Sequence, residues 1–383
     1  MINRVNDRVK DLEVPGIRVF SNEVAQYGDG VNLTIGEPDF PTPDRVKQAG
    51  IEAIQNNLTG YSHNAGLLEL REKVSLFFEE KYKILYDPVT EIVITTGASE
   101  GIDSILRTIL NEGDEVIMPA PIYSGYEPIV HLSGANVVYL DTMKTELVPC
   151  PEALAALITE KTKAIILNYP SNPTGMTLTK EQMDGIVNVL EKHDIFIISD
   201  EIYSENSFNE EHVSFASYPQ IRHKLFLIHG LSKSHAMTGW RLGFVLGPQD
   251  LMDHVLKVHL YNSICAALPS QYAGIEALTH SRNTPLAMNT AYLERRDYVY
   301  ERLTSMGLSV IKPTGAFYIF PSIEITGLTS WEFATKLLAS EHVAVVPGSA
   351  FTIYGEGFIR ISYANSMETL VEGMNRIERF ISG

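Results

Sequence analysis

The chain has 383 residues, of which 45% are hydrophobic, and its formal net charge is −17. An acidic surface repels phosphate backbones and anionic lipids, so the charge argues against nucleic acid or membrane partners. The apolar runs are too short for a membrane-spanning helix, and Cys150 and Cys265 form no disulfide framework or metal-binding pattern. We therefore expect a reduced, cytoplasmic protein without a metal site.

The length favours two domains. We expect residues 1–45 to form an N-terminal arm and part of a small domain, residues 46–280 a large domain, and residues 281–383 the rest of the small domain. In the large domain, apolar runs predict strands at residues 92–94, 116–118, 137–140, 164–167, 196–199, 226–228 and 244–246. Strands that are apolar throughout and separated by helices are typical of an α/β fold with a mainly parallel sheet.

Helical patterns separate these strands at residues 99–110, 126–132 and 180–192, and the last of these begins with Thr179 and Gln182 at capping-box spacing. After residue 250 the chain becomes mostly helical, with a long helix at 285–306. The tail mixes strands at 316–320, 343–346 and 358–362 with helices at 330–340 and 367–380. We expect this tail to form a smaller α+β domain.

Two polar residues stand at the ends of apolar strands. Lys233 follows the apolar run at 225–228, and Asp200 follows the run at 195–198. Poor solvation at such a position lowers the pKa of an amine and makes it a nucleophile. With Arg241 eight residues after Lys233, these residues supply an amine, an anion and a cation. Pyridoxal phosphate (PLP) requires these three groups for its aldehyde, ring nitrogen and phosphate.

The turn from Gly97 to Gly101 lies between a predicted strand and a predicted helix, where helix N–H groups can bind an anion. It also matches the G-x-S-x-G pattern of α/β-hydrolases, with Ser99 as the nucleophile. That alternative leaves Lys233 and Asp200 unexplained.

Several other residues have both a structural and a functional interpretation. Asn172 lies in a proline-rich turn after a strand, and its amide can serve the turn or a ligand. Arg360 lies within an apolar strand, where an arginine often matches a fixed anion. Tyr203, Tyr123 and Tyr61 are either core aromatics or site residues.

Taken together, these motifs resemble the class I and II PLP-dependent aminotransferases of fold type I, over nearly the whole chain. The resemblance rests on the order of Gly36, Tyr61, residues 97–100, Tyr123, residues 172–175, residues 200–203, residues 232–241 and Arg360. It implies a mainly parallel seven-stranded sheet flanked by helices, and a homodimer.

The resemblance also implies a role for each matching residue. Lys233 would bind the PLP aldehyde, Asp200 the ring nitrogen, and Asn172 and Tyr203 the 3-oxygen, while Tyr123 would stack on the ring. The phosphate would contact the turn at Gly97, Ala98 and Ser99, together with Ser232, Arg241 and the partner subunit's Tyr61. Arg360 and Gly36, with Asn172, would bind the substrate carboxylate, and Ile17 and Arg18 the rest of the substrate. Many relatives carry a serine where this chain has Gly230, so one phosphate contact is expected to be missing.

The implied reaction moves an amino group from an L-amino acid to a 2-oxo acid, with 2-oxoglutarate as the expected acceptor. The resemblance extends furthest to bacterial enzymes that act on N-acetyl-LL-2,6-diaminopimelate in lysine biosynthesis, through residues 15–18, 231–243, 347–351 and 354–357. An aspartate or aromatic aminotransferase and a C–S β-lyase of the same fold remain alternatives, because PLP supplies the carbanion chemistry that these enzymes share.

Overall fold

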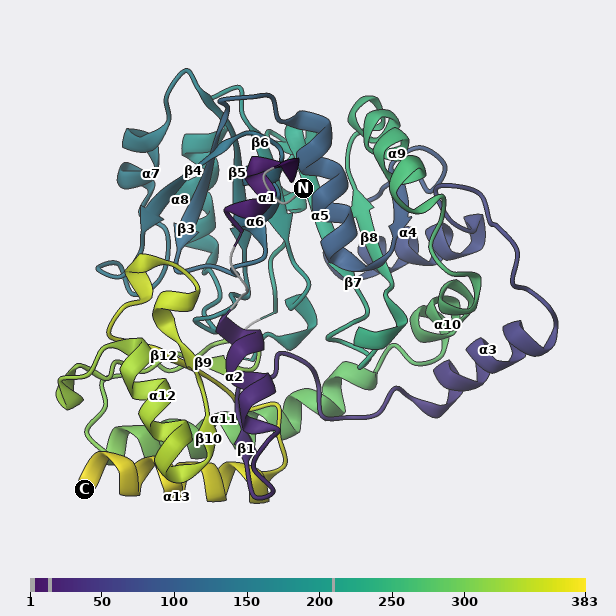
Figure 1. The fold of residues 1–383 in the computed structure, drawn as a ribbon. Coiled ribbons are helices and arrows are strands. Elements are labelled where there is room, and N and C mark those ends of the chain that lie inside the picture. The colour runs from purple at the N-terminus through teal and green to yellow at the C-terminus, as the bar shows by residue number, and fades with distance from the viewer. Residues whose placement is uncertain (1–3, 13–15, 209–210) are drawn as a thin grey trace.

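The centre of the structure is a seven-stranded sheet with the strand order β2-β8-β7-β6-β5-β3-β4 (Figure 1). The computed structural model describes residues 4–12, 16–208 and 211–383. The seven predicted strands are confirmed as β2 (Ile92–Thr95), β3 (Glu115–Ala120), β4 (Asn136–Asp141), β5 (Thr162–Asn168), β6 (Phe196–Asp200), β7 (Leu225–Gly230) and β8 (Gly243–Leu246). The sheet is parallel except for β8, which is antiparallel to both β7 and β2. The predicted fold class is therefore correct.

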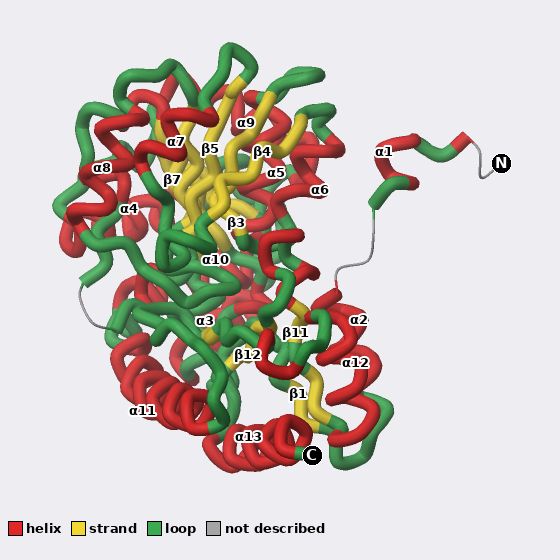
Figure 2. The backbone as a smooth tube through the Cα atoms, turned by 90° about the vertical axis from the view of Figure 1, so that its left-hand side faces the viewer, coloured by secondary structure: helices red, strands yellow, loops and turns green. Residues whose placement is uncertain are grey.

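Helices cover both faces of this sheet (Figure 2). One face is covered by α4 (Leu68–Tyr82), α7 (Pro151–Leu157), α8 (Lys180–Leu190) and α10 (Leu268–Thr279), and the other by α5 (Gly97–Ile109), α6 (Tyr126–Leu132) and α9 (Gln249–Ser263). The strands alternate between the two layers: Ile165 and Leu167 of β5 join the first core, and Ala164 and Ile166 join the second. Burial on both faces explains why these strands are apolar throughout. The capping box at Thr179 and Gln182 is confirmed.

A smaller part of the molecule lies below the large sheet in Figure 1. Its antiparallel sheet contains β9 (Tyr318–Ile319), β11 (Val346–Pro347) and β12 (Ile359–Ser362), and β1 (Val31–Asn32) pairs in parallel with β10 (Val343–Ala344). Around these strands pack α2 (Gly16–Val24), α11 (Thr284–Ser305), α12 (Ser330–Glu341) and α13 (Met367–Ser382). The single strand predicted at 343–346 is divided between two sheets, because the uninterrupted apolar run gives no sign of the change of partner.

Two further helices belong to the N-terminal quarter of the chain, α1 (Asp7–Lys10) and α3 (Asp44–Gln55). Short 3₁₀ helices lie at Ser204–Asn206, Phe215–Ser217, Arg222–Lys224, Thr238–Trp240, Glu324–Thr326, Gly348–Ala350 and Ile353–Gly355. We propose domain boundaries near residues 45 and 280, because α10 packs on the core of the large sheet and α11 on the smaller core. No helix in the described ranges is long and apolar enough to cross a bilayer.

Candidate active site

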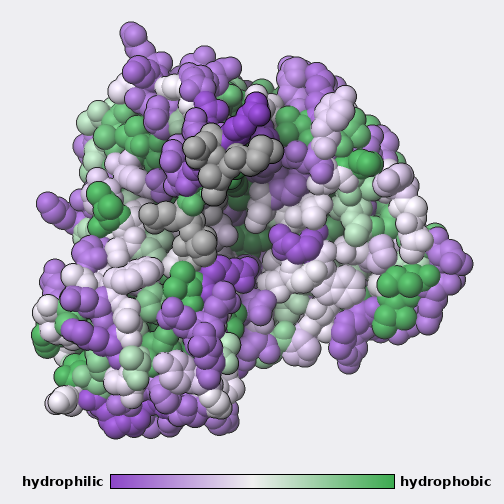
Figure 3. Space-filling view, in the orientation of Figure 1, coloured by the Kyte–Doolittle hydropathy of each residue, from purple (hydrophilic) through white to green (hydrophobic). Residues whose placement is uncertain are grey.

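The polar residues singled out in the sequence meet at one edge of the large sheet. The strands β2, β3, β5, β6 and β7 all end at this edge, and the antiparallel β8 begins there. A cavity of about 790 Å³ opens at this edge and is also lined by β12 and the N-terminal segment. Figure 3 shows a hollow in the surface where the upper and lower parts meet.

Most of the predicted site residues line this cavity. They are Arg18, Gly36, Ala98, Ser99, Tyr123, Asn172, Asp200, Tyr203, Ser232, Lys233, Arg241 and Arg360. Gly97 lies just behind the cavity wall, since a Cβ on it would overlap the guanidinium of Arg241. Tyr61 does not line the cavity and is 80% exposed. Ile17 is the second residue of α2, but its side chain lies outside the described part of the structure.

Asp200 is the last residue of β6, and its carboxylate faces the cavity. Tyr126 of α6 donates a hydrogen bond of 2.6 Å to Oδ2, and the backbone N–H of Ile202 donates one of 3.1 Å to Oδ1. Both donors are neutral. Burial raises the pKa of Asp200 to about 6, although the bond from Tyr126 favours the charged form. A cation placed against this carboxylate would therefore restore its ordinary ionisation.

The raised pKa of Asp200 predicts a pH-dependent cost to the stability of the protein without cofactor. An acid whose pKa rises from 3.8 to about 6 on folding destabilises the fold as pH climbs through that interval. Asp200→Asn cannot ionise. Its stability relative to the wild type is expected to improve by about 2.4 kcal/mol between pH 4 and pH 7, or roughly 3 °C in the unfolding midpoint of the apoprotein. Calorimetry at the two pH values measures the difference, and a difference that does not change with pH would contradict the prediction.

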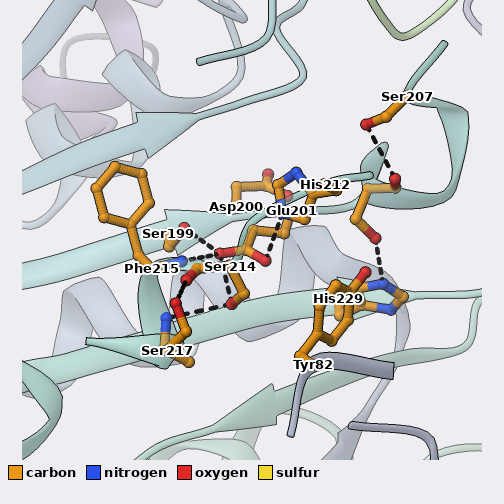
Figure 4. Close-up of polar contacts among 12 residues, drawn as sticks. Tyr82, Ser199, Asp200, Glu201, Ser207, His212, Ser214, Phe215, Ser217 and His229 are labelled. Carbon is orange, nitrogen blue, oxygen red and sulfur yellow. Dashed lines mark hydrogen bonds and ion pairs between the residues drawn. The ribbon is translucent and has the colours of Figure 1, made fainter. Parts of the chain in front are cut away.

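Glu201 follows Asp200 but faces the opposite side of the sheet, as the alternation along a strand requires. Its carboxylate is 1% exposed and accepts hydrogen bonds from Ser199 (2.8 Å), Ser214 (3.0 Å) and the N–H of Phe215 (3.0 Å). His212 lies 2.8 Å from its other oxygen (Figure 4). This network fixes the chain on both sides of Tyr203, so it holds the end of β6 from behind the cavity.

Lys233 lies three residues after β7, with its amine in the cavity. Nζ donates a hydrogen bond of 2.6 Å to the carbonyl of Gly36 and lies 5.6 Å from the ring centre of Tyr203. Burial is the main reason that the pKa of Lys233 is lowered to about 8; the charge of Glu37 opposes this shift, and the charges of Arg241 and Arg360 add to it. About a tenth of this amine is therefore unprotonated at pH 7, far more than for an ordinary lysine, as a nucleophile or base requires.

An anion-binding corner lies at the first turn of α5. The N–H groups of this turn point away from the helix, and Arg241 packs against Gly97 with Nη1 bonded to the carbonyl of Thr238 at 2.9 Å. Ser232 lines the same cavity. The backbone leaves little room for a side chain at Gly230, because a Cβ there would lie 2.9 Å from the carbonyl oxygen of Leu242.

A second cation, Arg360, lies on β12 at the opposite wall and is 1% exposed. Its Nη1 donates to Oδ1 of Asn172 at 2.9 Å, and its Nη2 donates to the carbonyl of Thr34. The buried Nε has no hydrogen-bond partner among the described residues. An unsatisfied guanidinium N–H costs free energy, so this arginine is suited to an incoming carboxylate.

Asn172 and Tyr203 lie beside Arg360. The side-chain nitrogen of Asn172 forms no hydrogen bond with a described residue, so it can donate to a ligand. The hydroxyl of Tyr203 lies 2.7 Å from that of Tyr318. A Cβ on Gly36 would lie 2.5 Å from the same Tyr318 hydroxyl, so the backbone passes close to the cavity at that point.

Comparison with known proteins agrees with this geometry. The model of the family "Aminotransferase class I and II" matches residues 28–377. The chain belongs to this family. It is 50% identical to a probable N-acetyl-LL-diaminopimelate aminotransferase of Bacillus subtilis, over 100% of this chain and 96% of that protein. It is 40% identical to an aspartate aminotransferase of Pyrococcus abyssi, over 98% of both chains. The solved aspartate aminotransferase of Thermus thermophilus with maleate superposes with a TM-score of 0.93 at 33% identity, covering 98% of this chain and 99% of that one.

As a class I and II aminotransferase, the chain is a PLP-dependent enzyme of fold type I. The hydrolase alternative is therefore wrong. The structure gives the reason, since the hydroxyl of Ser99 forms no hydrogen bond with a histidine in the described ranges. The G-x-S-x-G pattern here is a small-residue turn at a helix start.

The sequence analysis missed three residues of this aminotransferase site. Tyr126, Tyr318 and Thr34 contact Asp200, Tyr203 and Arg360, respectively. Tyr126 begins α6 and contacts the ring of Tyr123 edge to face at a ring-centre distance of 5.3 Å, but its local pattern does not distinguish it from a core aromatic. Tyr318 and Thr34 come from distant segments, and nothing in their local pattern separates them from core residues.

Proposed function

We propose that this aminotransferase transfers an amino group between N-acetyl-LL-2,6-diaminopimelate and 2-oxoglutarate. The B. subtilis relative with half of its residues identical is named for the first of these substrates. Both substrates carry two carboxylates. The observation that supports the proposal is a further cation in the cavity besides Lys233, Arg241 and Arg360: Arg18 of α2 lines the cavity and forms no hydrogen bond or ion pair with any described residue.

The cavity residues fit PLP. Asp200 is a buried carboxylate with only neutral donors, and a protonated ring nitrogen would supply its missing cation. Lys233 would hold the aldehyde, Asn172 and Tyr203 the 3-oxygen, and Tyr123 the ring face. The phosphate would lie in the corner at Ala98, Ser99, Ser232 and Arg241.

When bound, PLP supplies an electron sink for the charge that remains when the substrate loses its Cα proton. Nζ of Lys233 removes that proton, and its lowered pKa matches the task. The carboxylate of Asp200 keeps the ring nitrogen protonated. Arg360 binds the α-carboxylate by its unsatisfied Nε and fixes the orientation of Cα toward Lys233.

Arg18 would bind the distal carboxylate. Its positive charge acts on Tyr123, where it partly offsets the burial that raises the pKa of that phenol, so it lies near the proposed ring position. The T. thermophilus relative has been solved with maleate, which is a dicarboxylate.

The two arginines are expected to differ in a measurable way. Arg360→Ala should raise KM for every substrate with an α-carboxylate by about 100-fold, because a charge-assisted bidentate contact is lost. Arg18→Gln should raise KM about tenfold for 2-oxoglutarate and leave pyruvate, which has one carboxylate, within twofold. Steady-state kinetics with the two acceptors checks both. An equal effect of Arg18→Gln on both acceptors would remove it from the substrate site.

A donor screen tests the proposed substrate. With 2-oxoglutarate as acceptor, kcat/KM for N-acetyl-LL-diaminopimelate should exceed that for aspartate, aromatic and branched-chain amino acids by at least tenfold. A preference for aspartate or an aromatic donor would favour those aminotransferases instead. Release of pyruvate and ammonia from cystathionine without an oxo acid would favour the C–S β-lyase.

We further propose that the enzyme works as a cytoplasmic homodimer in which the partner's Tyr61 completes the phosphate site. Tyr61 is 80% exposed in the single chain, and Tyr261 is 89% exposed. Large exposed aromatic side chains are suited to burial in an interface. Sedimentation of the holoenzyme at micromolar concentration measures the oligomeric state, and a monomer with full PLP content would contradict this arrangement.

A further inference from the structure

A hydrogen-bonded pair of a buried histidine and a partly buried glutamate lies behind the first turn of α5, on residues that the proposed chemistry does not use. His259 of α9 is fully buried, and its Nδ1 lies 3.1 and 3.0 Å from the two carboxylate oxygens of Glu100. Its Nε2 lies 3.1 Å from the carbonyl oxygen of Asn64. The two helices pack against each other beside the large sheet (Figure 1).

The hydrogen bonds define the charge of this pair. A carbonyl oxygen only accepts, so Nε2 of His259 must carry a proton. The carboxylate of Glu100 also receives the N–H of Thr96 at 3.2 Å and the hydroxyl of Ser104 at 2.6 Å. The contact between Nδ1 of His259 and the carboxylate of Glu100 also needs one proton, held by either partner. With that proton the pair as a whole carries no net charge.

The pair lies behind the helical turn at which the cofactor phosphate is proposed to bind. Glu100 belongs to the same helical turn as Ala98 and Ser99, and its carboxylate caps the N–H of Thr96, the residue before the helix. An uncompensated carboxylate here would lower the positive potential of the helix N-terminus and repel a phosphate. Two other acids are nearby: Asp103 is paired with Arg107 and accepts from Asn262, and Glu37 lines the cavity and accepts from the hydroxyl of Thr238 at 3.1 Å.

We propose that His259 is a positioning residue for the phosphate group of PLP. Its ring shares with Glu100 the proton that leaves the pair without net charge, and it ties the first turn of α5 to the loop at Asn64. The side chain of Asn64 also donates to the carbonyl of Ile264 at 3.0 Å. The helix N-terminus is thereby left available to the phosphate. This inference depends on the proposed placement of the phosphate at α5.

The test compares two ligands and two variants. Dissociation constants of the full-length apoprotein are measured by absorbance and fluorescence for PLP and for pyridoxal, which lacks the phosphate. His259→Gln should weaken PLP about tenfold and pyridoxal less than twofold, because only the phosphate is repelled by the uncompensated Glu100. Glu100→Gln breaks the same contact but removes the negative charge, so it should bind PLP at least as tightly as the wild type.

Other results would overturn the proposal. If His259→Gln weakens the binding of PLP and of pyridoxal equally, His259 has a purely structural role. The same conclusion follows if Glu100→Gln loses as much affinity for PLP as His259→Gln does. An unchanged PLP affinity in His259→Gln would also exclude the proposed role of His259 in binding the phosphate. If His259→Gln does not fold, the double variant Glu100→Gln/His259→Gln should fold and bind PLP within threefold of the wild type, and a loss of tenfold or more would count against the proposal.

A control separates this inference from the function on which it depends. Arg241→Gln should abolish most of the preference of the wild type for PLP over pyridoxal. If it does not, the phosphate does not lie at α5 and the proposed placement fails. If it does and His259→Gln has no effect, only the role of His259 is wrong.

Discussion

Lys233→Ala is expected to reduce kcat by about 10⁴-fold or more and to abolish covalent trapping of the cofactor. The variant loses the amine that would hold the PLP aldehyde and also the base that would move the Cα proton, and a general base alone contributes up to about 10⁴-fold. Borohydride reduction of the wild type followed by peptide mass spectrometry should find the pyridoxyl group on Lys233. Turnover near the wild-type rate in Lys233→Ala would refute both roles.

A second buried lysine provides a matched control. Lys224 lies at the start of β7, is 5% exposed and donates to the carbonyls of Leu190 and His193. Burial also lowers its pKa, but it does not line the cavity. Lys224→Arg should therefore retain the pyridoxyl adduct and most of the activity, whereas Lys233→Arg should lose both. The contrast distinguishes position in the cavity from burial alone.

Asp200→Ala should slow the proton-transfer step by about 10²- to 10³-fold, because it removes a preorganised charge that would keep the ring nitrogen protonated. The step is measured in single turnovers with a Cα-deuterated donor, where a larger isotope effect than in the wild type is expected. A cofactor analogue methylated at the ring nitrogen carries a fixed positive charge. It should restore part of the rate in Asp200→Ala and none in Lys233→Ala.

The neighbouring carboxylate serves as the control for Asp200. Glu201→Gln changes an equally buried residue that faces away from the cavity, and its amide oxygen can still accept from Ser199, Ser214 and Phe215. We expect less than a tenfold loss of rate. If both variants slow the reaction equally, the effect of Asp200 comes from disruption of the strand end and not from contact with the ring.

The large sheet was predictable because its strands are buried on both faces. A short run that is apolar throughout, such as Ile165–Leu167, predicts a strand buried on both faces. A polar residue directly after such a run is expected at the edge of the sheet where the strand ends. Asp200 follows from that rule. Asn172 and Lys233 lie a few residues beyond the ends of β5 and β7, in loops at the same edge, so their convergence on one cavity was also foreseeable. The direction of β8 was not, because an apolar run carries no sign of its orientation.

The residues that support the site were harder to predict. Tyr126 and Glu201 act through single hydrogen bonds or a local network, and neither has a distinctive spacing. Arg360 was identified within an apolar strand, but its partner Thr34 is more than 300 residues away in the chain. Contacts of this kind depend on the packing of the two sheets, which local patterns do not encode.

The pairing of β1 with β10 has a consequence for how the protein is made. Val31 pairs in register with Val343, and its N–H donates to the carbonyl of His342 at 2.8 Å, so its strand partner emerges from the ribosome about 310 residues later. At typical synthesis rates that interval lasts roughly 15 to 60 s. During this time the large sheet can assemble, but the segment at Val31 has no strand to join. Completion of the smaller part is thus postponed to the end of translation.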